Sequence, residues 1–189
     1  MNKTAVQAGA YLHHLAFESS NPARLATFYS YAMDMDVTQL SHSEWRCEGP
    51  GRRMIVVPGT DKQLAYAGFA CRDQAGLTAL RLRAQQEGLE ILDSPSPYFQ
   101  PDAFALCDPN GQTLCFGLAK LAQNHRAGLQ GPVQHLTFAA TNVESFVAFY
   151  QNRLGFLLTD RVLHDDGTLA TAFLTSNHEH HTLACFKSD

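Results

Sequence analysis

Hydrophobic and polar positions follow one pattern near the start of the chain. The alternating stretch His14-Leu15-Ala16-Phe17 is typical of a strand. Asn21 then predicts a helix start, because Asn is a preferred N-cap. Apolar residues after it recur at three- and four-residue spacing, which places them on one helical face: Leu25, Phe28, Tyr29 and Met33. Further strands are predicted at residues 37–40, 45–48 and 54–57.

The same pattern returns 121 residues later without a gap. The matched residues are His14-Leu15 with His135-Leu136, Phe17 with Phe138, Asn21 with Asn142, and Phe28-Tyr29 with Phe149-Tyr150. So many identities at one offset indicate an internal duplication. The later copy predicts strands at residues 158–163, 169–175 and 182–187.

A weaker copy lies between the two. Residues 65–71 predict a strand, and residues 75–86 predict a helix with Leu77, Leu80 and Leu82 on its apolar face and Gly88 as its stop. Strands follow at residues 90–92, 103–107 and 113–118, with a hairpin turn at Asp108-Pro109-Asn110-Gly111. The chain is therefore predicted to be an α+β protein built from three βαβββ units.

The polar segment 121–132 predicts a linker. It divides the chain into a first domain, residues 1–120, with two units, and a half-domain, residues 133–189, with the third. A sheet with one apolar face must be covered. We therefore expect either a fourth unit or pairing with another copy, as in a homo-oligomer.

Composition excludes several classes of partner. The 14 basic and 18 acidic residues give a net charge of −4, so we expect no nucleic-acid partner. No apolar run approaches the ~18 residues of a membrane span, and no secretory signal precedes the first strand. Five cysteines without a C-x-x-C pair predict reduced thiols, which favours a cytoplasmic protein without a membrane partner.

Repeated βαβββ units resemble the building block of the vicinal oxygen chelate superfamily. That group includes glyoxalase I, bleomycin-resistance proteins, fosfomycin-resistance enzymes and type I extradiol ring-cleavage dioxygenases. The third unit most resembles the extradiol enzymes, through Phe149-Tyr150, Leu154-Gly155-Phe156, Phe173-Leu174, Asn177 and His180-His181-Thr182-Leu183-Ala184. The first two units resemble that family's N-terminal domain, which usually holds no metal.

This resemblance implies two ligands of Fe(II) or Mn(II). They are the strand His135 and the second histidine of the His-His-Thr-Leu-Ala strand, His181. The third ligand of the family is a Glu in a fourth unit, and the chain ends at Asp189 before such a unit. The site is therefore expected to be incomplete, and the 189-residue chain inactive by itself.

Two imidazoles and one carboxylate leave three metal positions open. A catechol would chelate through its two oxygens and O₂ would take the third position, so the expected partners are a small aromatic diol and O₂. The family also uses an acid–base histidine, for which His164 is the candidate; its alternative is a surface histidine in a hairpin. His14 is expected to be a structural counterpart of His135.

The sequence therefore predicts an extradiol ring-cleavage dioxygenase of catecholic compounds that uses Fe(II), with Mn(II) as the second choice. One alternative is a non-catalytic protein of the same superfamily that binds a small aromatic ligand. Another is a different metal chemistry of the same fold, such as isomerisation or thiol addition. The enzymatic hypothesis requires the rings of His135 and His181 to lie close together, away from the helix layer.

Overall fold

The computed structural model describes residues 4–120 and 131–188. After a short helix α1 (Thr4–Gln7), the first repeat comprises β1 (Tyr11–Ser19), α2 (Pro22–Met33), β2 (Asp36–Gln39), β3 (Trp45–Gly49) and β4 (Arg52–Pro58). The second repeat comprises β5 (Leu64–Ala70), α3 (Gln74–Gln86), β6 (Leu92–Asp93), β7 (Phe104–Cys107) and β8 (Thr113–Gly117). The third comprises β9 (Leu136–Ala140), α4 (Val143–Ala148), the π-helix η1 (Phe149–Leu154), β10 (Leu157–Leu163), β11 (Leu169–Thr175) and β12 (Leu183–Lys187).

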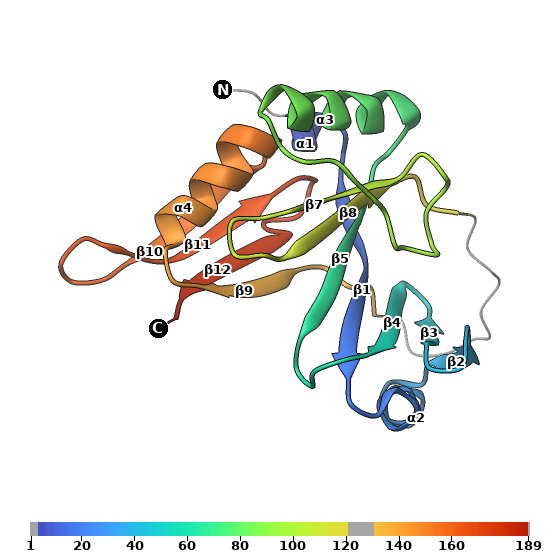
Figure 1. The fold of residues 1–189 in the computed structure, drawn as a ribbon. Coiled ribbons are helices and arrows are strands. Elements are labelled where there is room, and N and C mark those ends of the chain that lie inside the picture. The colour runs from blue at the N-terminus through green and yellow to red at the C-terminus, as the bar shows by residue number, and fades with distance from the viewer. Residues whose placement is uncertain (1–3, 121–130, 189) are drawn as a thin grey trace. The chain divides into compact units, whose positions relative to one another are not determined.

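All three repeats share one topology, which can be followed by colour in Figure 1. Their strand orders are β2-β3-β4-β1, β5-β8-β7-β6 and β10-β11-β12-β9. In each repeat the strand before the helix therefore neighbours the last strand. That pair is parallel for β1 with β4 and for β9 with β12. The predicted α+β class with repeated βαβββ units is confirmed.

Equivalent residues set the helix boundaries of the first and third repeats. The Asn21 side chain accepts a hydrogen bond from the backbone N–H of Arg24 at 3.1 Å, and that of Asn142 accepts one from Ser145 at 2.7 Å. Both helices end on a left-handed residue, Asp34 at φ 50° and Gly155 at φ 79°. The duplication seen in the sequence is thus also a duplication of caps.

Contacts group the described residues into two compact units. The larger unit holds the residues up to Leu12, Phe69–Lys120 and the residues from Gln134 on; the smaller unit holds His13–Gly68 and residues 131–133. The predicted domains, 1–120 and 133–189, stay a prediction. Most of the predicted linker, residues 121–130, lies outside the described residues.

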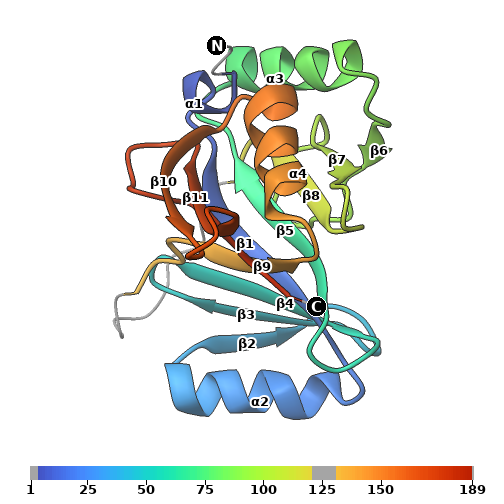
Figure 2. The ribbon, with the colours of Figure 1, turned by 90° about the vertical axis from the view of Figure 1, so that its left-hand side faces the viewer.

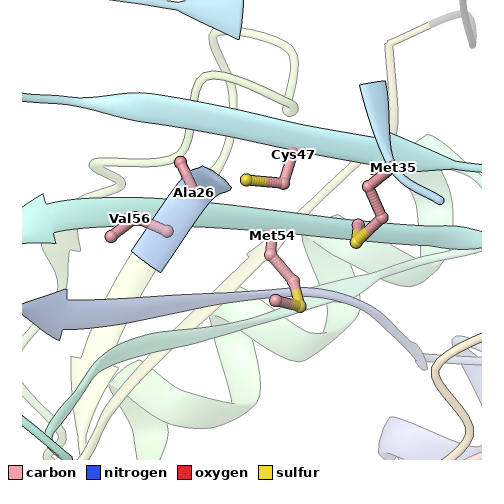
Figure 3. Packing of buried hydrophobic residues seen from close by; sticks show 5 residues of the cluster. All are labelled: Ala26, Met35, Cys47, Met54 and Val56. Atoms are coloured by element: carbon pink, nitrogen blue, oxygen red, sulfur yellow. The ribbon is translucent and has the colours of Figure 1, made fainter. Parts of the chain in front are cut away.

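Within the smaller unit, α2 lies along β2, β3 and β4 (Figure 2). Its contact point is Ala26, which is buried among Met35, Cys47, Met54 and Val56 (Figure 3). The prediction that Phe28 and Met33 share the buried face is wrong in this repeat, because their side chains are 58% and 39% exposed. The helix packs on the sheet through Ala26 together with Leu25 and Tyr29, which turns residue 28 outward. In the third repeat all four equivalents of the predicted face are buried: Phe146, Phe149, Tyr150 and Leu154.

The apolar face of α3 also needs one correction. Leu77, Leu80 and Ala84 are buried, whereas Leu82 is 51% exposed. Residue 82 lies two positions after Leu80, which rotates it about 200° around the helix axis, away from the core. Ala84 occupies the buried position that was expected for Leu82.

Second and third repeats are joined inside the larger unit. The Tyr150 hydroxyl donates to Asp108 Oδ2 at 3.2 Å, and both groups are buried. The rings of Phe69 and Phe156 meet edge to face at 5.9 Å. The Arg83 guanidinium of α3 donates to backbone carbonyls at the end of η1.

Two further features bear on the expected class of protein. Among the described residues no helix is both long enough and apolar enough to cross a membrane. Four of the five cysteines are buried and Cys107 is exposed. Burial raises the pKa of the Cys71 and Cys115 thiols to about 12, so these thiols stay protonated and unreactive.

Candidate functional site

His135 and His181 lie at the same end of the third-repeat sheet. His135 immediately precedes β9, and His181 lies two residues before β12. Because β9 and β12 run parallel, with Leu136 opposite Leu183, the residues before both strands meet at one edge. The first of these imidazoles is exposed and the second is half-buried.

The two rings approach each other directly. Their centroids are 4.6 Å apart and their planes are tilted by 49°. The Phe173 ring of β11 meets His181 edge to face at 5.0 Å. The closeness that the enzymatic hypothesis requires is therefore present, while metal binding by the pair stays a prediction.

A second histidine contact fixes the orientation of His181. Its Nδ1 lies 3.0 Å from Nδ1 of His180, so one nitrogen donates a proton to the other. Nε2 of His181 is thereby the nitrogen left for a metal ion or a proton transfer. Burial, followed by the neighbouring His135 and His180, lowers the pKa of His181 below its usual value. A neutral imidazole is the form that both roles need.

Hydrogen bonds brace the loop that carries this pair. Ser176 Oγ donates to the carbonyl of Ala10 at 2.6 Å, and the Ser176 N–H donates to Thr182 Oγ1 at 3.2 Å. The Thr182 N–H donates to the carbonyl of Leu174 at 2.9 Å. The Asn177 side chain accepts from the Glu179 N–H at 2.8 Å. The loop is thus tied at both ends, which limits the freedom of His181.

Side chains along β9 alternate between the two faces of the sheet. Phe138 is buried toward the helix layer, whereas Thr137 and Ala139 are exposed on the face that follows from His135. In β12, simple strand alternation would put His181 on the same face as Leu183 and Cys185, and the structure differs. Leu183 and Cys185 are fully buried, while His181 turns to the ring of His135. The strand begins only at Leu183, so its alternation does not extend back to residue 181.

His164 is not brought to this pair. It lies in the turn between β10 and β11, where its N–H donates to the carbonyl of Thr168 at 2.8 Å. The ladder pairs Leu163 with Leu169, whereas the histidine end of the sheet pairs Leu174 with Leu183. The acid–base role of His164 stays a prediction, and the register places it at the opposite end of the sheet.

His14, the counterpart of His135, is fully buried in the smaller unit. Its Nδ1 lies 2.9 Å from Nδ1 of His13, and its ring meets Tyr66 edge to face at 5.7 Å. Burial lowers the pKa of His13 to about 4 and that of His14 well below its usual value. This pair is a neutral part of the interior.

Two imidazoles fit two positions of a divalent metal ion but do not complete a site. Within the described ranges no three His, Cys, Asp or Glu side chains are grouped so that they could hold a metal ion. The nearby carboxylate of Glu179 lies 3.5 Å from Nε2 of the exposed His178.

Two features of the site were not predicted from the sequence. One is the Phe173 ring beside His181, which alternation along β11 could have indicated. The other is the hydrogen bond between Ser176 and Thr182, which we call the Ser176–Thr182 brace.

Comparison with known proteins finds similarity in the third repeat and across the chain. Residues 133–189 match the model of the Glyoxalase/Bleomycin resistance protein/Dioxygenase superfamily. The chain is 26% identical over 159 residues to a biphenyl-2,3-diol 1,2-dioxygenase of Paraburkholderia xenovorans, covering 74% of this chain and 53% of that protein. It is 23% identical over 197 residues to a 3-methylcatechol 2,3-dioxygenase of Pseudomonas putida, covering 93% and 67%. The chain thus spans about half the length of the first of these relatives.

Solved structures share the fold. A halotolerant catechol dioxygenase superposes with a TM-score of 0.78 at 19% identity, covering 94% of this chain and 64% of that one. Homoprotocatechuate 2,3-dioxygenase from Brevibacterium fuscum gives 0.78 at 17% identity, covering 96% and 62%. The chain therefore shares the fold of these dioxygenase structures, and its residues 133–189 are similar to the Glyoxalase/Bleomycin resistance protein/Dioxygenase superfamily.

Proposed function

We propose that this chain belongs to an extradiol ring-cleavage dioxygenase that acts on catecholic aromatic compounds. The observation that carries the proposal is the approach of the His135 and His181 rings to 4.6 Å at one edge of the third-repeat sheet. Relatives that are dioxygenases of aromatic diols support it. A non-haem divalent metal, Fe(II) or Mn(II), would supply the chelation of the diol and the electron path to O₂.

The chain's own residues would position and protect that chemistry. Nε2 of His181 and a ring nitrogen of His135 would hold the ion, and a third ligand would come from beyond the described residues. Phe173 lies beside His181 and provides an aromatic wall for a ring substrate. The Ser176–Thr182 brace keeps the loop in place.

One observation favours a second role for His181. When Nδ1 of His181 carries the hydrogen of its contact with His180, Nε2 is the unprotonated nitrogen, which suits a group that takes a proton from a catechol. Under this alternative His135 alone of the pair binds the ion, and His181 is the acid–base residue in place of His164.

A binding protein without catalysis is the other candidate function. It is favoured by the lack of a third ligand among the described residues. Its concave sheet would hold a small aromatic ligand, and any affinity for metal ions would not depend on His135 or His181.

Metal titration separates these candidates. We expect Mn(II), Ni(II) and Fe(II) affinity to fall by at least about tenfold in His135→Ala. An equal fall of metal affinity in His181→Ala indicates that His181 is a metal ligand. If His181→Ala keeps the wild-type metal affinity but no longer takes up oxygen with catechols, His181 has the acid–base role. His164→Ala serves as the control for metal affinity. Affinity that is unchanged in both His135→Ala and His181→Ala would contradict the proposal.

The exposed face of the third-repeat sheet supports the expected homo-oligomer. Val162, Thr171, Phe186 and Ala139 lie in one row across β10, β11, β12 and β9. Val162 and Phe186 are both exposed. Pairing through this face stays a prediction.

A further inference from the structure

The larger unit contains a cavity of about 440 Å³ that neither His135 nor His181 lines. Three chain segments that are far apart in the sequence form its walls. The lining residues are Val6, Gly9, Tyr11, Arg72, Asn177 and His178. A cavity of this size falls within the range of small-molecule sites, about 300–1,000 Å³.

Hydrogen bonds hold the three walls together. The Arg72 N–H donates to the carbonyl of Ala8 at 2.9 Å. On the other side, the buried Ser176 Oγ donates to the carbonyl of Ala10 at 2.6 Å. The segment after α1 is therefore tied both to the turn between β5 and α3 and to the loop before β12.

Gly9 makes room for the guanidinium of Arg72. A Cβ at residue 9 would lie 2.7 Å from Nη2 and 3.1 Å from Nε of Arg72, so the guanidinium occupies the space of a side chain. The backbone of Gly9 is left-handed, at φ 58°, a conformation that glycine adopts without strain. The packing at Gly9 thus sets where the positive charge of Arg72 lies in the cavity wall.

This positive charge is not balanced inside the cavity. Among the described residues no carboxylate forms an ion pair with Arg72, and none of those that line the cavity is acidic. The neighbouring carboxylate of Asp73 instead caps α3, where it accepts a hydrogen bond from the Gly76 N–H at 2.8 Å. The guanidinium therefore keeps its donors for a ligand.

Asn177 adds a second donor on the opposite wall. Its Oδ1 accepts a hydrogen bond from the Glu179 N–H at 2.8 Å, so Nδ2 is the amide atom that remains for a ligand. The Glu179 carboxylate lies 3.5 Å from Nε2 of His178 and does not line the cavity. Donors on both walls favour an anion as the ligand.

We propose that this cavity binds a small organic carboxylate, held by Arg72 and Asn177, with its apolar part against Val6 and Tyr11. A guanidinium donates to a planar carboxylate through two parallel N–H groups. Its single charge matches a monoanion, whereas a phosphate group carries roughly −1.5 to −2. The half-buried Val6 and the Tyr11 ring, which is 40% exposed, give the wall for a ring or short hydrocarbon. The proposal is independent of metal binding at His135 and His181.

Titration calorimetry of the full chain with benzoate tests this site. We expect Arg72→Gln to weaken benzoate binding by at least about tenfold. Asn177→Asp should do the same, because it keeps the oxygen that accepts the Glu179 N–H but places a negative charge in the cavity. Arg161→Gln, which changes an exposed arginine of β10 outside the cavity, is the matched control and leaves the affinity unchanged. Benzamide, the uncharged analogue, should bind at least about tenfold more weakly than benzoate.

Hydrogen exchange locates the bound benzoate. Saturation should slow the exchange of the backbone amides of residues 177–179, because the ligand joins this loop to Arg72. The affinity should be unchanged in His135→Ala. Loss of binding in that variant would place benzoate at the histidine pair and overturn the proposal. So would undetectable binding, unchanged affinity in Arg72→Gln, unchanged exchange at residues 177–179, or inorganic phosphate binding as tightly as benzoate.

Discussion

At the scale of single residues, two equivalent histidines lie in opposite surroundings. His135 is exposed beside His181, whereas His14 is buried against β5. The space for the His14 ring exists because residue 68 is glycine. A Cβ at that position would lie 2.0 Å from His14 Cε1.

Gly68→Ala should therefore unfold the smaller unit more readily. We expect a loss of about 3 kcal/mol, typical of overpacking in a core. Removing the obstructing ring in Gly68→Ala/His14→Ala should recover part of the loss, giving a coupling free energy in a double-mutant cycle from urea unfolding. Strict additivity of the two changes would show that the ring does not occupy this space.

Buried neutral histidines also predict how stability depends on pH. The pKa of His13 is about 4 in the folded chain against an ordinary 6.5, so the unfolded chain binds more protons between these values. Stability from this residue is complete above pH ~6.5 and falls by about 1.4 kcal/mol per pH unit on acidification toward pH ~4. His13→Asn should flatten this slope. The exposed His42→Asn is the control, and an equal effect of both would contradict the assignment.

At the scale of elements, the π-helix η1 changes what the repeated Phe-Tyr pair does. Tyr150 is fully buried and its hydroxyl reaches Asp108 of the second repeat. Burial, together with the Asp108 carboxylate, raises the pKa of Tyr150 well above its usual value. Its counterpart Tyr29 is only half-buried on α2.

Tyr150→Phe should consequently cost about 1–3 kcal/mol of unfolding free energy, because Asp108 loses a buried donor. Tyr29→Phe, the equivalent change in the first repeat, should cost less than about 0.5 kcal/mol. Chemical denaturation of both variants makes the comparison. Equal losses would show that the Asp108 contact contributes nothing.

Sequence patterns predicted the elements well and their surroundings less well. Asn21 and Asn142 were correctly predicted to start the helices, because caps are local. The π-helix was not predicted, since Phe149 and Tyr150 fit ordinary helical spacing equally well. Exposure of Phe28 and Leu82 was missed because burial depends on which helix face meets the sheet. At the candidate site, the proximity of His135 and His181 was expected. The loop before β12 takes His181 out of the strand alternation, and the hydrogen bonds that hold this loop cannot be predicted from residue spacing in the sequence.

At the scale of the whole molecule, the third repeat is part of the structure around the second. Phe156 contacts Phe69, Tyr150 contacts Asp108, and Arg83 holds the end of η1. These contacts belong to one compact unit although they join segments far apart in the sequence.

Truncation after residue 132 should for this reason give a less stable protein. Loss of the third repeat uncovers the Phe69 ring and the Asp108 carboxylate, so we expect a lower urea midpoint and binding of a hydrophobic dye. A fragment with the wild-type midpoint and no dye binding would instead support an independent domain at residues 1–120.

Gly68 has one further consequence, which concerns time rather than energy. By admitting the His14 ring into the interior, it shields the Cε1 hydrogen of that ring from bulk water. Deuterium should therefore replace this hydrogen far more slowly at residue 14 than at residue 135, in a single sample followed by mass spectrometry. The two duplicated histidines would then exchange at different rates. Opening of the fold would limit exchange at His14, whereas exchange at His135 would proceed at the rate of a solvent-exposed imidazole.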